Sequence, residues 1–178
     1  VSLARDGRVV VYMGDDERFE YIYKFVSRDR FRAGSPANAN LLDEGTLYVA
    51  RFDDDGKGRW LPLRYGEYHQ NGALTASNGF TSQGDVVIRC RQAADLAGAT
   101  KMDRPEWIAV HPQSGEVYVT LTNNVKRGTP QAPGPDAANP RPENNFGHIV
   151  RWRENNQNPA STAFEWDIFA LAGDPHNP

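Results

Sequence analysis

The sequence of 178 residues contains a single cysteine, Cys90, so it cannot form an internal disulfide bond. It also lacks any apolar stretch approaching the roughly 20 residues that a membrane-spanning helix requires. Neither sign of charge is in excess, because 20 basic residues face 23 acidic residues and the formal net charge is −3. We therefore expect neither a nucleic-acid partner nor binding to an anionic membrane surface.

Histidine motifs for metal binding are absent as well. The four histidines, His69, His111, His148 and His176, form neither an HxH nor an HExxH pattern. His148 follows Gly147 and has the best claim of the four to face a loop, so we keep it as a candidate site residue. Residues 53–56 read Asp-Asp-Asp-Gly but lack the spacing of an EF-hand, and we interpret them as a hairpin turn.

Aromatic residues make up 11% of the sequence, which is too many for a disordered chain. Short segments rich in β-branched and aromatic residues, each bounded by Gly, Asn, Asp or Pro, predict strands. These segments are 8–13, 21–26, 46–52, 59–63, 107–111, 116–121, 148–152 and 163–169. Residues 85–97 are predicted to form one short helix that ends at Gly98. Residues 126–145 contain five prolines and predict a long surface loop.

Two parts of the sequence resemble each other. Residues 7–16 start at a glycine, continue as a strand and end in Asp15-Asp16, and a second aromatic strand follows; residues 115–124 repeat this order and end in Asn123-Asn124. A repeat of this kind favours a β-propeller, and the predicted strands would make about two four-stranded blades. An ordinary β-sandwich is the alternative. The fold prediction is thus an all-β partial β-propeller with one short helix and a long proline-rich loop.

The segment Asp103-Arg104-Pro105-Glu106-Trp107 carries the most informative chemistry. Pro105 biases Arg104 toward an extended backbone, and alternate residues of an extended segment point the same way, so Arg104 and Glu106 are expected to face one site. A guanidinium grips phosphate oxygens through two parallel hydrogen bonds, and a carboxylate beside it binds a metal. The alternative is a surface ion pair at the start of a strand.

The paired Asp15-Asp16 and Asn123-Asn124 offer a second set of ligands at the predicted strand ends. Their oxygen atoms suit hard cations such as Ca²⁺ and Fe³⁺. The alternative reading is that they are turn residues, since Asp and Asn favour turns.

Several segments resemble PhoX-type bacterial alkaline phosphatases. These are residues 12–27, 45–52, 60–63, 101–107 and 147–152, which occur in order along nearly the whole chain. The resemblance implies a β-propeller phosphomonoesterase that uses calcium and iron at the mouth of the propeller channel. It also implies a periplasmic or extracellular location, a small-molecule phosphate ester as substrate, and a monomer in the full-length form.

The resemblance also implies roles for individual residues. Arg104 matches an arginine that contacts phosphate, and Glu106 matches a metal ligand. A second acidic ligand is placed on Glu17, with Asp16 next, and Asn124 is a weaker candidate.

The family takes a cysteine and further acidic ligands from a motif that lies upstream of the first strand here, and Cys90 does not lie in a matching motif. We therefore expect residues 1–178 to be a fragment of a single propeller domain, with both flanking regions missing and part of the site present. A calcium-dependent propeller lactonase or esterase and a non-catalytic propeller binding module remain the alternatives.

Overall fold

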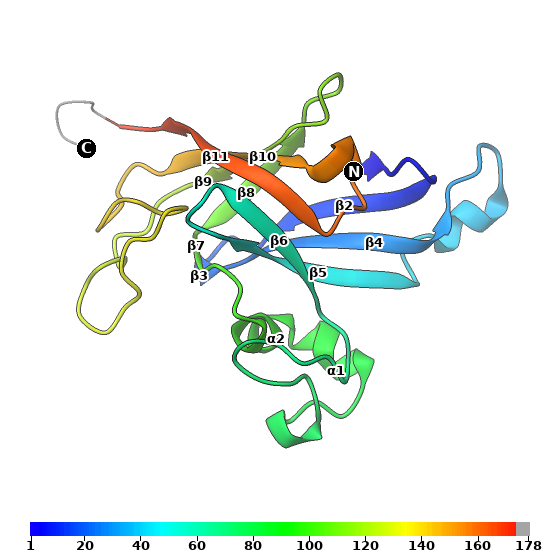
Figure 1. The fold of residues 1–178 in the computed structure, drawn as a ribbon, viewed down its shortest axis with the longest axis horizontal. Helices are drawn as coiled ribbons and strands as arrows, with labels where there is room; N and C mark the ends of the chain where they lie inside the picture. The colour runs from blue at the N-terminus through cyan, green and yellow to red at the C-terminus, as the bar shows by residue number, and fades with distance from the viewer. Residues whose placement is uncertain (174–178) are drawn as a thin grey trace.

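The computed structural model describes residues 1–173 and shows a mainly β protein (Figure 1). Nine strands form one antiparallel sheet in the order β1-β2-β4-β5-β6-β11-β10-β9-β8, and β3 pairs separately with β7. Their bounds are β1 Ser2–Leu3, β2 Arg8–Gly14, β3 Arg18–Glu20, β4 Ile22–Arg30, β5 Gly45–Phe52, β6 Lys57–Pro62, β7 Met102–Asp103, β8 Pro105–Val110, β9 Val117–Leu121, β10 His148–Glu154 and β11 Ala163–Leu171. Short 3₁₀ helices occupy Pro36–Asn40, Ala76–Asn78 and Asn155–Gln157.

The sheet consists of two four-stranded meanders that correspond to the two expected blades. One meander is β2-β4-β5-β6, the other is β8-β9-β10-β11, and they join where β6 pairs with β11 around Gly58 and Phe164. All eight strands predicted from the sequence are present, so the all-β, propeller-type fold is confirmed. The strands β1, β3 and β7 were not predicted, because two or three residues are too few to show an alternating pattern.

Aromatic side chains from both meanders pack together between them. Trp152 of β10 meets Tyr12 of β2 edge to face, with ring centroids 5.5 Å apart, and Trp60 of β6 lies 5.2 Å from Phe164 of β11. Trp60, Trp152 and Phe164 are almost fully buried. Because each meander supplies part of this core, neither can bury its apolar face without the other.

A buried ion pair crosses the same core. The ammonium of Lys24 on β4 lies 3.2 Å from the carboxylate of Glu154 on β10, and both side chains are nearly inaccessible to solvent. Tyr12 and Trp60 also donate hydrogen bonds to Glu154, at 2.9 and 3.0 Å. Burial raises the pKa of Glu154 and lowers the pKa of Lys24, while their mutual attraction opposes both shifts.

The predicted helix is present, but it is divided. Residues between β6 and β7 contain α1 (Gln83–Ile88) and α2 (Cys90–Ala97), which meet at a non-helical Arg89. Gly98 ends α2 in the left-handed conformation, as expected from the sequence. Both helices pack on the β4–β5 part of the sheet through a second core that includes Tyr23, Val49 and Leu74, and Figure 1 shows them below the strands. Among the described residues, no helix is long and apolar enough to cross a membrane.

The proline-rich segment connects β9 to β10 without regular secondary structure, as predicted, and Figure 1 shows it on the same side of the molecule as β3 and β7. Its five prolines are exposed or partly exposed, but Arg127, Asn139 and Asn144 are buried. The segment is therefore a surface loop with three polar side chains that point inward.

Candidate functional site

The end of β2 and the start of β8 come into direct contact, and this contact brings together most of the predicted site residues. A Cβ atom on Gly14 would lie 2.5 Å from the carbonyl oxygen of Pro105, closer than real Cβ contacts allow. Glycine at this position thus permits the two backbones to meet. The loop that follows Gly14 is placed beside the residues around Pro105 as a result. Pro105 also pairs with Leu121, the last residue of β9.

The internal sequence repeat predicted that Asp15-Asp16 and Asn123-Asn124 lie near one another because the strands before them hold equivalent positions in two blades. This equivalence is wrong, because β2 is the first strand of its meander and β9 is the second strand of its own. Their ends meet because β8 lies against both, and no blade symmetry is needed.

Arg104 has a left-handed backbone, with φ +57°, so the expectation of an extended conformation is wrong. A tertiary hydrogen bond opposes the bias that Pro105 imposes, because Thr122 donates its backbone N–H to the Arg104 carbonyl at 3.2 Å. The guanidinium reaches Asp16, with Nη2 3.2 Å from Oδ1, and Nη1 donates to Oδ1 of Asn123 at 3.5 Å. Arg104 is 30% exposed, and its remaining N–H groups are available to a ligand at the surface.

The three predicted acidic ligands lie on the two segments that meet at Gly14. Glu106 is exposed at an irregularity in the β8–β9 register, which also exposes Trp107. Glu17 is exposed and accepts a hydrogen bond from the backbone of Arg18 at 2.6 Å. Asp16 is exposed too, but its carboxylate is already paired with Arg104. The oxygen atoms of these residues suit calcium or iron.

Their number is not sufficient for a complete metal centre. Within residues 1–173, no group of three or more His, Cys, Asp or Glu side chains is arranged to hold a metal ion. The donor set is therefore chemically suitable but incomplete.

Helix α2 fixes the acidic segment 15–20 through a contact that the sequence did not reveal. Arg91 of α2 donates two hydrogen bonds to Asp15, at 2.7 and 2.9 Å, and lies 3.3 Å from Glu20. Asp15 is thus engaged by the helix, unlike Glu17. No sequence pattern indicated this pairing, because 76 positions separate the two residues.

The two weaker candidates, Asn124 and His148, lie below the surface, and hydrogen bonds connect both to buried Asp103, directly or through one further residue. Asn124 donates to Asp103 Oδ1 at 2.9 Å, and His148 is linked to Asp103 through Asn144. Burial lowers the pKa of His148, so the ring is neutral, with Nε2 donating to the Ala138 carbonyl at 2.7 Å and Nδ1 accepting from Asn144. Both side chains are buried and do not reach the surface at Arg104.

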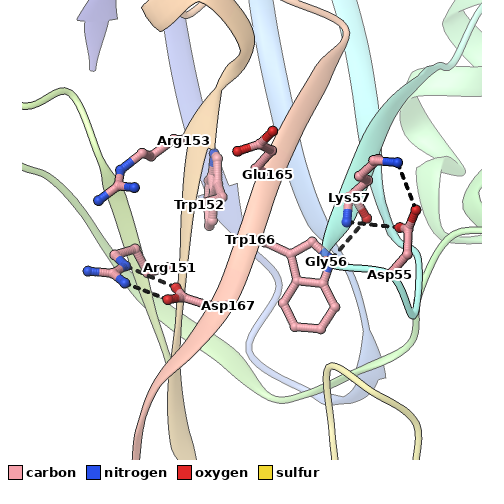
Figure 2. A pocket seen from close by; sticks show the side chains of 9 residues that line it. All are labelled: Asp55, Gly56, Lys57, Arg151, Trp152, Arg153, Glu165, Trp166 and Asp167. Atoms are coloured by element: carbon pink, nitrogen blue, oxygen red, sulfur yellow. Dashed lines mark hydrogen bonds and ion pairs between the residues drawn. The ribbon is translucent and has the colours of Figure 1, made fainter.

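A separate groove of about 370 Å³ lies over β6, β10 and β11 (Figure 2). Four of its charged side chains form two ion pairs: Arg151 pairs with Asp167, and Lys57 pairs with Asp55 at 3.1 Å. Trp166 donates its indole N–H to the Lys57 carbonyl at 2.9 Å. The groove contains none of the predicted site residues.

The fold and the surface at Arg104 define an all-β protein of the propeller type, with an arginine and several carboxylates where strands of its two meanders meet. The model of the alkaline phosphatase PhoX family matches residues 1–178, and the chain belongs to this family.

A solved structure of PhoX from Pseudomonas fluorescens, in complex with the transition-state analogue vanadate, is similar to this chain. It shares 52% sequence identity with a TM-score of 0.89, and the match covers 98% of this chain. The chain spans 31% of the length of that protein. No curated protein matches the sequence.

Proposed function

We propose that this chain contributes the phosphate-binding arginine and part of the metal ligands to an alkaline phosphatase that hydrolyses phosphate monoesters. The observation that carries the proposal is the fixed position of Arg104, beside Asp16 and Asn123, in a chain 52% identical to a PhoX that binds vanadate. Vanadate resembles a phosphoryl group in transfer, so the relative has a site for such a group.

In this proposal the guanidinium of Arg104 binds two equatorial oxygens of the phosphoryl group. It offsets the negative charge that these oxygens carry as the bond to the leaving oxygen breaks. Asp16 and Asn123 hold the guanidinium from one side, so it need not reorganise when the substrate arrives.

We further propose that Glu106, Glu17 and then Asp16 bind calcium and iron together with ligands from outside this chain. Bound metals would polarise the phosphate and activate an oxygen nucleophile. Support comes from the chemistry of these carboxylates, which are hard oxygen donors on the two segments that meet at Gly14. The substrate would be a small phosphate ester at the mouth of a propeller channel, in a periplasmic or extracellular monomer.

The test uses the full-length, metal-replete protein with p-nitrophenyl phosphate and, separately, a lactone. Arg104→Ala is expected to lower kcat/KM for the phosphate ester by about a hundredfold or more, the usual effect of removing a transition-state charge partner. Arg59→Ala is the matched control, because Arg59 is also an exposed arginine 3.2 Å from an aspartate, Asp53.

Activity toward the lactone alone would replace the proposal with the lactonase alternative. If kcat/KM of Arg104→Ala for the phosphate ester falls by less than tenfold, Arg104 has a structural role and does not bind the phosphoryl group.

A further inference from the structure

A buried set of polar side chains lies directly behind Arg104. We call it the Asp103 network; its members are Asp103, Asn124, Arg127, Asn139, Asn144 and His148, and all are buried. Arg127 and Asp103 form its central ion pair, with Nε 2.6 Å from Oδ1 and both side chains at 0% exposure. Asn144 donates to the other carboxylate oxygen at 3.0 Å. Both oxygens of Asp103 are therefore held.

The Asp103 network also holds the backbone that leads into Arg104. Arg127 Nη2 donates to the Lys101 carbonyl at 2.6 Å, and Asn139 donates to the same carbonyl at 3.1 Å. Asn139 accepts from the Asp103 N–H at 3.1 Å. The proline-rich loop thereby fixes residues 101–103 through its side chains, in addition to the pairing of β7 with β3.

Arg104 needs such support, because its left-handed backbone is one that L-residues rarely adopt. A conformation of this kind persists where its surroundings over-determine it. Buried Asp103 precedes Arg104 and buried Pro105 follows it, so both neighbours are fixed.

The same network reaches the partner of the guanidinium. Asn123 accepts from Arg104 Nη1, and the next residue, Asn124, is anchored on Asp103. The backbone and the tip of Arg104 are thus positioned from one buried cluster.

We infer that the Asp103 network, and Arg127 in particular, is a positioning device that holds Arg104 in place for the phosphoryl group. This inference rests on the proposed function. Arg127 lies below the surface and does not touch substrate, so its effect on phosphate binding passes through Arg104.

The test compares Arg127→Met with Lys24→Met in the full-length protein. Each change removes the cation of a fully buried ion pair, but Lys24 pairs with Glu154 in the central core, away from the Asp103 network. Both variants are expected to unfold at lower temperature. Only Arg127→Met is expected to weaken competitive inhibition by vanadate, by about tenfold or more, while Lys24→Met stays within about threefold of the wild type.

A double-mutant cycle shows whether Arg127 acts through Arg104. The double variant Arg104→Ala/Arg127→Met is expected to bind vanadate as weakly as Arg104→Ala alone, because the positioned group is already gone. Arg127→Lys keeps the positive charge but loses the planar guanidinium. We therefore expect it to lose vanadate affinity to an extent between the wild type and Arg127→Met. If Arg127→Met does not fold, Arg127→Lys is judged by the same cycle.

Two results would overturn the inference while leaving the proposed function intact. In the first, Arg104→Ala loses vanadate binding, but vanadate inhibits the Arg127 variant as strongly as it inhibits the wild type. In the second, the double variant loses vanadate affinity by the sum of the free-energy losses of the two single variants. Unchanged vanadate binding in Arg104→Ala would instead refute the proposed function itself.

Discussion

Replacing Arg104 by glycine and, separately, by alanine measures how much strain the left-handed arginine carries. Both changes remove the guanidinium and with it the ion pair to Asp16. The side chains of Arg104 and Asp16 are 30% and 42% exposed, so this ion pair contributes about 0–1 kcal/mol to the free energy of unfolding. The two changes differ in the backbone, since φ at this position is +57°. Alanine keeps a steric cost of about 1–2 kcal/mol in this conformation, whereas glycine has none.

Glycine adds a cost of its own in the unfolded chain, about 0.4–1 kcal/mol of conformational entropy. The difference predicts that Arg104→Gly is more stable than Arg104→Ala by about 0.5–1 kcal/mol. For a chain of this length each 1 kcal/mol shifts Tm by about 2–4 °C. Thermal unfolding followed by circular dichroism or calorimetry resolves such a shift, and both variants are expected to have lost phosphatase activity to the same extent.

Arg59 provides the control for this comparison, because it lies inside β6, paired with β5 and β11. Glycine in the middle of a strand is about 0.5–1 kcal/mol less favourable than alanine, so the order of stability is expected to reverse there. If the alanine variant is the more stable at Arg104 as well, the reasoning about strain is refuted.

Three further predictions concern the rest of the structure. Gly14→Ala is expected to cost about 1–3 kcal/mol and to lower activity, because the added methyl forces β2 away from β8; Gly134→Ala, where nothing lies within 4 Å, should be neutral in both chemical denaturation and turnover. Glu154→Gln leaves the charge of Lys24 buried without its counterion, and urea unfolding is expected to show a loss of about 3–5 kcal/mol. Burial lowers the pKa of His148, so the unfolded chain takes up its proton first and stability falls as the pH drops below about 6.5; His148→Gln should flatten that part of the pH profile, and an unchanged profile would contradict the assignment.

The strands were predictable because their signal is local. Alternating β-branched and aromatic residues marked 46–52 and 148–152, and β5 and β10 lie within two residues of those bounds. Arg104 and Glu106 were also selected as candidate site residues from the sequence, because an arginine and a carboxylate flank a proline at the start of a strand.

The conformation of Arg104 was not predictable, because the local rule for a residue before proline gives the opposite answer. The Asp103 network was hidden for a related reason. Its polar members lie in a proline-rich segment that has the composition of a solvated loop, and Arg127 meets Asp103 across 24 positions of sequence. Only the tertiary fold converts such residues into a buried cluster.

The inward-facing polar side chains of the proline-rich loop have a thermodynamic consequence. Opening this loop would expose amide, carboxylate and guanidinium groups, such as those of Asn139, Asp103 and Arg127, rather than much apolar surface. Exposure of polar groups lowers the heat capacity of unfolding, and exposure of apolar groups raises it. The free energy of loop opening should therefore vary almost linearly with temperature, while that of the aromatic core between the two meanders should curve. Amide hydrogen exchange over a range of temperatures would separate the two motions within a single molecule.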